Sequence, residues 1–211
     1  MAILKRTYGI LFAGVATAAV IGMSAAPAFA ATTWSVSPGG AITAKSGTTT
    51  LKDTTTGNSL TCKSSSTSAT LKKGSGLSGT AIGSITKATF STCTGPLDLT
   101  FTVTTKALPW KLNAVSYDSS TGVTTGTITH IDATLSGPSC SADVDGTGAG
   151  KDNGTVKVTY TNSTGKLKVL TTGGNLHVYD VSGCAGLINS GDASTFTATY
   201  KVSPKQTIKG S

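Results

Sequence analysis

Apolar and polar residues alternate one by one along several stretches of this chain. The alternation is clearest in residues 97–105, 155–160, 166–170 and 195–202, where apolar side chains occupy every second position and Thr or Lys occupies most of the others. A two-residue period places the apolar side chains on one face of a β-strand. Antiparallel sheets that cover a core on one side have this pattern, so these stretches are predicted as strands of such a sheet.

The stretches between the predicted strands contain turn-forming residues. Residues 118–122, 162–165 and 173–175 each supply Gly or Asn for the positive φ angles of tight hairpins. Residues 154–181 are therefore predicted as a three-stranded meander. Abundant Thr and the absence of Glu favour strands over helices along the chain. The expected fold class is all-β, either an antiparallel β-sandwich or a flattened barrel, and the pattern leaves these two architectures open.

Residues 31–211 are long enough for one sizeable domain. A weak internal similarity relates residues 83–90 to residues 126–135, and each segment is followed by a Cys. This similarity is compatible with two related β units, at about 31–120 and 121–211, within one fold. Chance similarity in a Thr-rich chain explains it equally well. The expectation is a single secreted β-rich domain over residues 31–211.

Residues 1–30 have the organisation of a secretory signal peptide. Lys5 and Arg6 precede an apolar run, and an Ala-Phe-Ala cleavage pattern ends the segment at residues 28–30. The run is shorter than the ~20 residues that a membrane-spanning helix needs, which disfavours a retained anchor. We expect cleavage after Ala30 and a mature protein that is secreted, extracellular or cell-wall associated, with no membrane span.

The mature chain is expected to be basic without arginine. All nine acidic residues are Asp, and loss of Lys5 and Arg6 with the leader reduces the 17 basic residues to 15 Lys, a net charge of +6. The lysines are spread singly along the predicted strands. Because the guanidinium groups that recognise phosphates and bases are missing, no nucleic-acid partner is expected. A loose attraction to an anionic cell-wall polymer fits this charge.

Four cysteines follow the cleavage site: Cys62, Cys93, Cys140 and Cys184. An even number of cysteines in an exported chain indicates disulfides. Cys62–Cys93 with Cys140–Cys184 is the preferred pairing, because each bond then closes a loop of moderate length within one half of the chain. Cys93–Cys140 with Cys62–Cys184 is the alternative, since the internal similarity could make those strands neighbours. Cys184 is then expected to pin a strand end and not to act as a nucleophile.

Few residues are available for catalysis. His130 and Asp132 are two positions apart on one predicted strand, and His177 begins the stretch 177–192 that also contains Cys184. A hydrolase would have to bring both histidines and an Asp into one cleft. The alternation places His130 and Asp132 on a polar face for solvent, and Asp180 on the strand face opposite His177. We therefore expect no catalytic residues, and a secreted Asp/His hydrolase is the alternative.

Residues 143–153 carry Asp at alternating positions and resemble a calcium-binding loop. The twelfth position of the EF-hand pattern is Gly154 instead of Glu, and Asp, Gly and Asn are equally what an exposed β-turn requires. With two histidines in the chain, a three-histidine zinc site is excluded. Neither a metal nor a cofactor is expected.

Trp110 is the candidate ligand contact. It ends residues 107–110, which are predicted as a corner between two strands. Its indole either fills the core or lines a ligand pocket. The sequence favours the core and leaves the ligand pocket as the alternative. An apolar cavity between the sheets would make an apolar small molecule a candidate partner.

Residues 34–40, 93–99, 108–113 and 183–187 together resemble a group of uncharacterised secreted β-rich proteins of actinobacteria. The resemblance covers most of the mature chain and implies an exported protein of a Gram-positive organism. It implies no activity and no site residues. The missing catalytic set favours a non-enzymatic secreted β-domain, a binding or cell-envelope-associated module.

Overall fold

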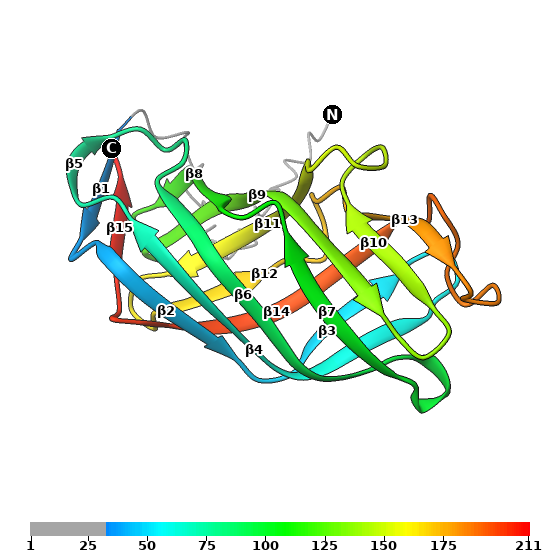
Figure 1. The fold of residues 1–211 in the computed structure, drawn as a ribbon. Helices are drawn as coiled ribbons and strands as arrows, with labels where there is room; N and C mark the ends of the chain where they lie inside the picture. The colour runs from blue at the N-terminus through cyan, green and yellow to red at the C-terminus, as the bar shows by residue number, and fades with distance from the viewer. Residues whose placement is uncertain (1–32) are drawn as a thin grey trace, which may run out of the picture.

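The computed structural model describes residues 33–211, which form an antiparallel all-β fold (Figure 1). The signal peptide predicted over residues 1–30 lies outside the described residues. A short 3-10 helix, η1, spans Pro96–Asp98. Within residues 33–211 no helix has the length and apolar character needed to cross a membrane. The strands are β1 Trp34–Ser37, β2 Gly40–Ser46, β3 Thr49–Asp53, β4 Ser59–Leu71, β5 Gly74–Leu77, β6 Gly83–Thr94, β7 Thr100–Lys106, β8 Trp110–Asp118, β9 Val123–Ser136, β10 Ser141–Asp145, β11 Gly154–Thr161, β12 Lys166–Val169, β13 His177–Ser182, β14 Ser194–Ser203 and β15 Thr207–Gly210.

Eight strands close into a continuous ring. Their hydrogen-bonded order is β11, β12, β14, β2, β4, β6, β8, β9 and back to β11, with every pair antiparallel. The long strand β9 makes the closure, because its first part pairs with β8 and β11 while its second part pairs with β7 and β10. Figure 1 shows the ring flattened into two layers, with β2, β4 and β6 in front of β11, β12 and β14. The architecture is therefore a flattened barrel with a sandwich-like cross-section.

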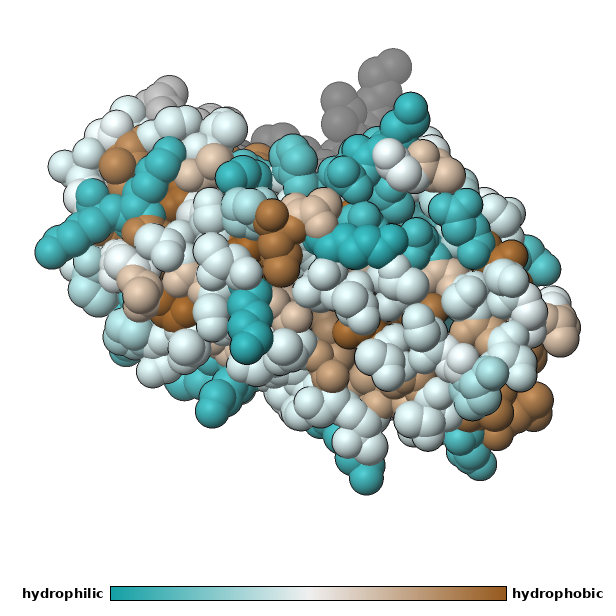
Figure 2. Space-filling model, in the orientation of Figure 1, coloured by the Kyte–Doolittle hydropathy of each residue, from teal (hydrophilic) through white to brown (hydrophobic). Residues whose placement is uncertain are grey.

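The predicted alternation places apolar side chains inside this ring. The buried apolar side chains of β11 and β14 follow it and are Val156, Val158, Tyr160, Ala198, Tyr200 and Val202. The outward positions on these strands are mostly Thr and Lys. The face in Figure 2 accordingly has mostly intermediate hydropathy, with small and separate hydrophobic patches. The hydrophobic core thus lies between the two layers.

Residues 154–181 do not form the predicted three-stranded meander. β11 and β12 make the expected hairpin, with Gly165 at φ 64°, but β12 pairs next with β14, and β13 pairs with β10. The segment between β12 and β13 instead follows β11, since Leu170 N–H donates to Lys157 O and Asn175 N–H donates to Thr155 O. Turn residues specify where the chain reverses, and they do not specify which distant strand pairs with the next one.

The strand predicted at residues 97–105 begins later than expected. Leu97 and Asp98 lie in η1 with φ angles of 57° and 58°, and Leu97 is 81% exposed. β7 starts at Thr100, and from there Phe101 points into the core as predicted. Pro96 lacks the N–H that a strand ladder uses, which favours a turn at this point.

A second, three-stranded sheet covers one end of the ring, and we call it the cap sheet. Its order is β15–β1–β5, so the first and last strands of the described chain are adjacent (Figure 1). Trp34 and Val36 of β1 are fully buried under it. The buried Gln206 joins the cap sheet to the ring: its Oε1 accepts from Gly39 N–H at 2.8 Å, and its backbone exchanges two 2.9 Å hydrogen bonds with the Tyr160 hydroxyl.

Two disulfides confirm the preferred pairing. Cys62–Cys93 joins facing residues of β4 and β6, and Cys140–Cys184 joins the residue before β10 to the loop after β13. The alternative pairing is wrong because Cys93 lies directly opposite Cys62 in the strand ladder. No cysteine within residues 33–211 is free, so Cys184 offers no thiolate nucleophile.

Candidate functional site

The interior of the ring contains an apolar cavity of about 120 Å³. Inward-facing side chains from both layers form its wall, because alternation brings the apolar face of every ring strand to the inside. Among the described residues, no charged side chain lines it. Protein interiors contain few voids larger than a water molecule, so a cavity of this size is a distinct feature of the fold. Its wall includes Ile42, Leu60, Ile85, Ile128, Val156 and Phe196.

Three hydroxyl side chains also line the cavity: Thr49, Thr67 and Tyr200. The Tyr200 hydroxyl lies 2.9 Å from Ser65 Oγ, and burial raises the pKa of Tyr200. Thr49 is 1% exposed, and its Oγ1 has no hydrogen-bond partner among the described residues. A buried hydroxyl without a partner destabilises the folded state by about 1–3 kcal/mol. Thr49 is therefore an energetically unfavourable residue in this wall.

Trp110 forms part of the cavity wall. It is 7% exposed and ends the predicted corner between β7 and β8 as the first residue of β8. Its indole Nε1 donates to Lys106 O at 2.9 Å, so the polar end of the ring is satisfied by the backbone. The Trp110 side chain therefore belongs to the core and also lines the cavity. Its contact with a ligand stays a prediction.

The ring is closed through β14, but one edge of the N-terminal part of β14 has no neighbouring strand. On one side, β14 pairs with β12 as far as Ala198. The next hydrogen bond on that side runs from Ser194 N–H to Leu176 O. No described strand therefore pairs with residues 195–197 on the β12 side. A groove of about 530 Å³ with both polar and apolar walls, which includes Thr197, is formed by residues 46–48, 168–172 and 197–199. Val169 lines both this groove and the cavity. The groove therefore ends at the cavity wall.

A charged cluster occupies the outer side of β7, β9 and β10, where hydrophilic residues gather in Figure 2. Lys106 Nζ lies 2.8 Å from Asp143 Oδ2 and 4.0 Å from Asp132 Oδ1. Burial raises the pKa of Asp132 to about 6 against the attraction of Lys106, and a hydrogen bond with Asp152 adds to the rise. Burial opposes ionisation of Asp143 too, but hydrogen bonds from Lys106 and Thr134 lower its pKa. The cluster is therefore a set of ion-paired surface side chains in which the Asp132 carboxyl is a weak acid.

The structure does not join the two histidines to a carboxylate. His130 is exposed at a β-bulge with φ 65°, and its Nδ1 lies 3.1 Å from Thr129 Oγ1. His177 Nδ1 lies 2.8 Å from Asn175 O, and its ring stacks on Tyr179 with centroids 6.2 Å apart. Among residues 33–211, no hydrogen bond or ion pair links either imidazole to an Asp. The candidate hydrolase residues are therefore not assembled into a catalytic set.

Asp145 organises the loop that resembles a calcium site. It is 2% exposed, and its two carboxylate oxygens accept four backbone N–H groups at 2.6–3.1 Å, those of Gly146, Lys151, Asp152 and Asn153. Although burial opposes it, these bonds lower the pKa of Asp145. The carboxylate thus fixes the loop conformation through backbone donors. Within the described chain, no group of three or more metal-ligating side chains could hold an ion.

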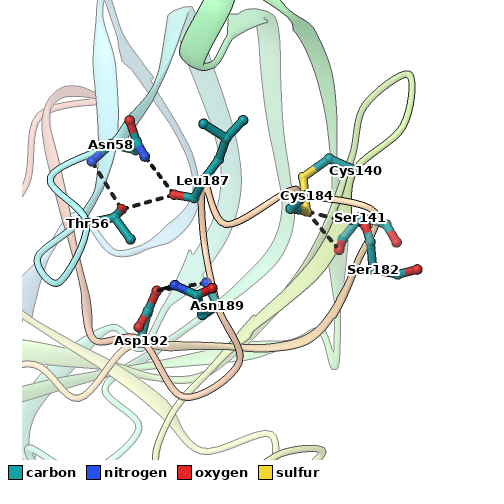
Figure 3. The surroundings of a disulfide bond; sticks show 9 residues. All are labelled: Thr56, Asn58, Cys140, Ser141, Ser182, Cys184, Leu187, Asn189 and Asp192. Carbon is teal, nitrogen blue, oxygen red and sulfur yellow. Dashed lines mark hydrogen bonds between the residues drawn. A yellow bond between two sulfur atoms is a disulfide. The ribbon is translucent and has the colours of Figure 1, made fainter.

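The stretch after β13 is a loop held at its start and near its middle (Figure 3). Cys184 is bonded to Cys140 at its start. Further along, Leu187 O accepts hydrogen bonds from Thr56 Oγ1 at 3.0 Å and from Asn58 Nδ2 at 2.7 Å. These contacts attach the loop to the turn after β3, so residues 183–192 serve as a structural connection.

Sequence reasoning missed Thr49, and it raised an apolar cavity between the sheets without placing it or its lining residues. Thr49 lies in a run of three threonines at residues 48–50, and nothing in the run itself distinguishes the inward one. The spacing to Leu51, which shares its face, was the available signal. A cavity has no local signature, because it depends on how side chains from many strands fill a common space.

Comparison of the chain with protein-family models, curated proteins and solved structures finds no match. The class of the protein is thus defined by its structure: a disulfide-linked, flattened antiparallel barrel with a cap sheet and an apolar interior cavity. The resemblance to secreted actinobacterial proteins stays a prediction.

Proposed function

We propose that the protein is an exported, non-enzymatic β-domain that binds a small apolar molecule inside its barrel. The observation that carries this proposal is the cavity of about 120 Å³ and its apolar wall. A buried cavity of roughly 150 Å³ lined by Leu, Ile and Phe stays dry and binds benzene or xenon. The cavity of this barrel has the same chemistry and a similar size.

The cost of the cavity supports a use for it. At roughly 24 cal/mol per Å³, an unfilled cavity of this volume destabilises the fold by about 3 kcal/mol relative to a filled one. That is a large fraction of the net stability of most domains. A ligand that fills the space recovers dispersion contacts for the wall.

Export is part of the proposal. The signal-peptide pattern of residues 1–30 directs the chain out of the cytoplasm, and the two disulfides are consistent with an extracellular location. The lysine-rich outer surface would hold the protein loosely at an anionic cell wall. A carrier or sensor of small apolar compounds outside the cell fits these features.

Benzene tests the proposal. Thermal unfolding of the disulfide-intact protein is followed at increasing benzene concentrations in sealed cells. Because a ligand that binds the folded state alone stabilises it by mass action, we expect Tm to rise steadily with benzene concentration. An unchanged Tm up to the solubility limit of benzene would contradict a binding cavity.

A matched pair of variants assigns the effect to the cavity. Ala88 and Ala142 are both buried, but Ala88 lines the cavity and Ala142 does not. Ala88→Val adds two methyl groups to the cavity space, so the benzene-dependent rise in Tm should fall by at least about half. Ala142→Val should keep the wild-type response. Equal responses of the two variants would place benzene elsewhere.

A further inference from the structure

We propose that the natural ligand is an uncharged molecule with an apolar body and one hydroxyl or carbonyl oxygen, and that this oxygen binds Thr49 Oγ1. This inference rests on the proposed function and adds the polar group of the ligand and its position. It identifies Thr49 as the residue that determines specificity in the cavity.

The position of Thr49 supports this role. It is the first residue of β3, pairs with Cys62 of β4, and shares its inward face with Leu51. Its side chain is 1% exposed and lines the cavity, while Oγ1 has no partner within the described chain. Native structures satisfy most buried polar atoms, so an unpartnered hydroxyl in an otherwise apolar wall calls for a partner from outside the chain.

An ordered water is a poorer partner for Thr49 than a ligand oxygen. A buried water is held by two to four polar groups. Tyr200 already bonds to Ser65, and Thr67 lies five residues from Cys62 along β4, about 17 Å from the position opposite Thr49. The Thr49 hydroxyl is unpaired within the described chain, and one such partner suffices for a ligand oxygen, whereas a buried water needs at least one more.

The wall also restricts the charge of the ligand. No charged side chain among the described residues lines the cavity, and an unpaired ion in such surroundings is strongly disfavoured. Thr49 can donate or accept a hydrogen bond, so it suits an alcohol, a phenol or a ketone. A carboxylate or an amine would lose its hydration without gaining a counter-ion.

The groove beside β14 lies next to the part of the cavity wall that contains Thr49. Residues 46–48 line the groove and Thr49 follows directly, lining the cavity. Val169 belongs to both walls, beside the edge of residues 195–197 that has no neighbouring strand.

Phenol and benzene, which differ by one hydroxyl, test the inference. Their dissociation constants are measured by calorimetric titration for the wild type, Thr49→Val and Thr50→Val. Thr49→Val keeps the side-chain shape and removes only a buried, unpartnered hydroxyl, so it should fold. We expect it to weaken phenol about 2- to 10-fold, the range of one neutral hydrogen bond, and to leave benzene unchanged or slightly tighter.

Thr50→Val is the control, because Thr50 alternates to the opposite face of β3 and does not line the cavity. It should leave both ligands at wild-type affinity. If both ligands bind the wild type and Thr49→Val alters them equally or not at all, the role of Thr49 is wrong and the cavity proposal stands. If neither ligand binds the wild type, the proposed function fails and this inference fails with it.

Discussion

Buried polar side chains in this protein differ in how they are satisfied. Asp145 accepts four backbone N–H groups, and Gln206 bonds to Gly39 and Tyr160. Asp132 is 8% exposed, and its pKa is raised to about 6. Thr49 has no partner in the described chain. Asp145 and Gln206 stabilise the fold through these hydrogen bonds, whereas the burial of Asp132 and of Thr49 lowers the stability of the folded state.

Asp132 makes stability depend on pH. Burial raises its pKa from 3.8 to about 6, so the folded state binds the proton more tightly than the unfolded state. The resulting stabilisation is complete below pH 3.8 and is lost as pH rises through about 6. Asn at this position imitates the protonated form. We expect Asp132→Asn to have a Tm a few degrees above wild type at pH 7 and close to it at pH 4, measured by thermal unfolding.

Asp118→Asn is the control for this profile. Hydrogen bonds from Ser120 and Thr121 lower the pKa of Asp118 to about 2, so its ionised form favours the folded state at pH above 3.8. This variant should therefore be no more stable than wild type at pH 7. If the Tm of the wild type and the Tm of Asp132→Asn changed by the same amount between pH 4 and pH 7, the raised pKa of Asp132 would be contradicted.

At the scale of elements, short-range signals predicted the strands and the hairpins well. The turns at Gly122 and Gly165, both with positive φ, join β8 to β9 and β11 to β12 as expected. The partner of β13 was predicted wrongly, because pairing with β10 depends on contacts between distant segments. The similar segments 83–90 and 126–135 lie in β6 and β9, and both of these strands pair with β7 and β8.

The two disulfides join elements in different ways, which predicts different local effects. Their sequence separations of 31 and 44 residues imply about 4 kcal/mol of stabilisation for each through restriction of the unfolded chain. Of the two bonds, only Cys140–Cys184 involves the 183–192 loop, which it attaches to the residue before β10. The double variant Cys140→Ala, Cys184→Ala should therefore lose roughly this stability in urea unfolding and also show faster amide hydrogen exchange in that loop.

The double variant Cys62→Ala, Cys93→Ala provides the comparison. It should lose similar global stability but keep the wild-type exchange rate in residues 183–192, since β4 and β6 stay paired through their backbone ladder. Equal exchange in the loop for both variants would show that the bond to Cys140 does not hold it.

At the scale of the whole molecule, strands from distant parts of the sequence complete the ring and close its end. β14 lies between β12 and β2, and β15 pairs with β1. Gln206 connects this cap sheet to the ring at Gly39 and Tyr160. The interior is therefore sealed at this end by contacts between the first and last strands of the described chain.

Gln206→Ala tests this connection. The substitution removes the buried Gln206 side chain and leaves the half-buried Gly39 N–H without its side-chain acceptor, so we expect a loss of about 1–3 kcal/mol in urea unfolding. Trp34 fluorescence should shift to the red as the cap sheet loosens. Lys205→Ala, at the exposed neighbouring position, should change neither quantity. A Gln206→Ala protein with wild-type stability would mean that the cap is held by its apolar contacts alone.

The sequence by itself determined the all-β class, the faces of the strands, the hairpin turns and the preferred disulfide pairing. These follow from alternation, turn chemistry and cysteine spacing, which act over short stretches or limit the alternatives to a few. The tertiary structure alone decided the closed ring, the partner of β13, the cap sheet and the cavity with Thr49 in its wall. Each of these depends on contacts between residues far apart in the chain, and no local pattern specifies which distant segments fill the same space.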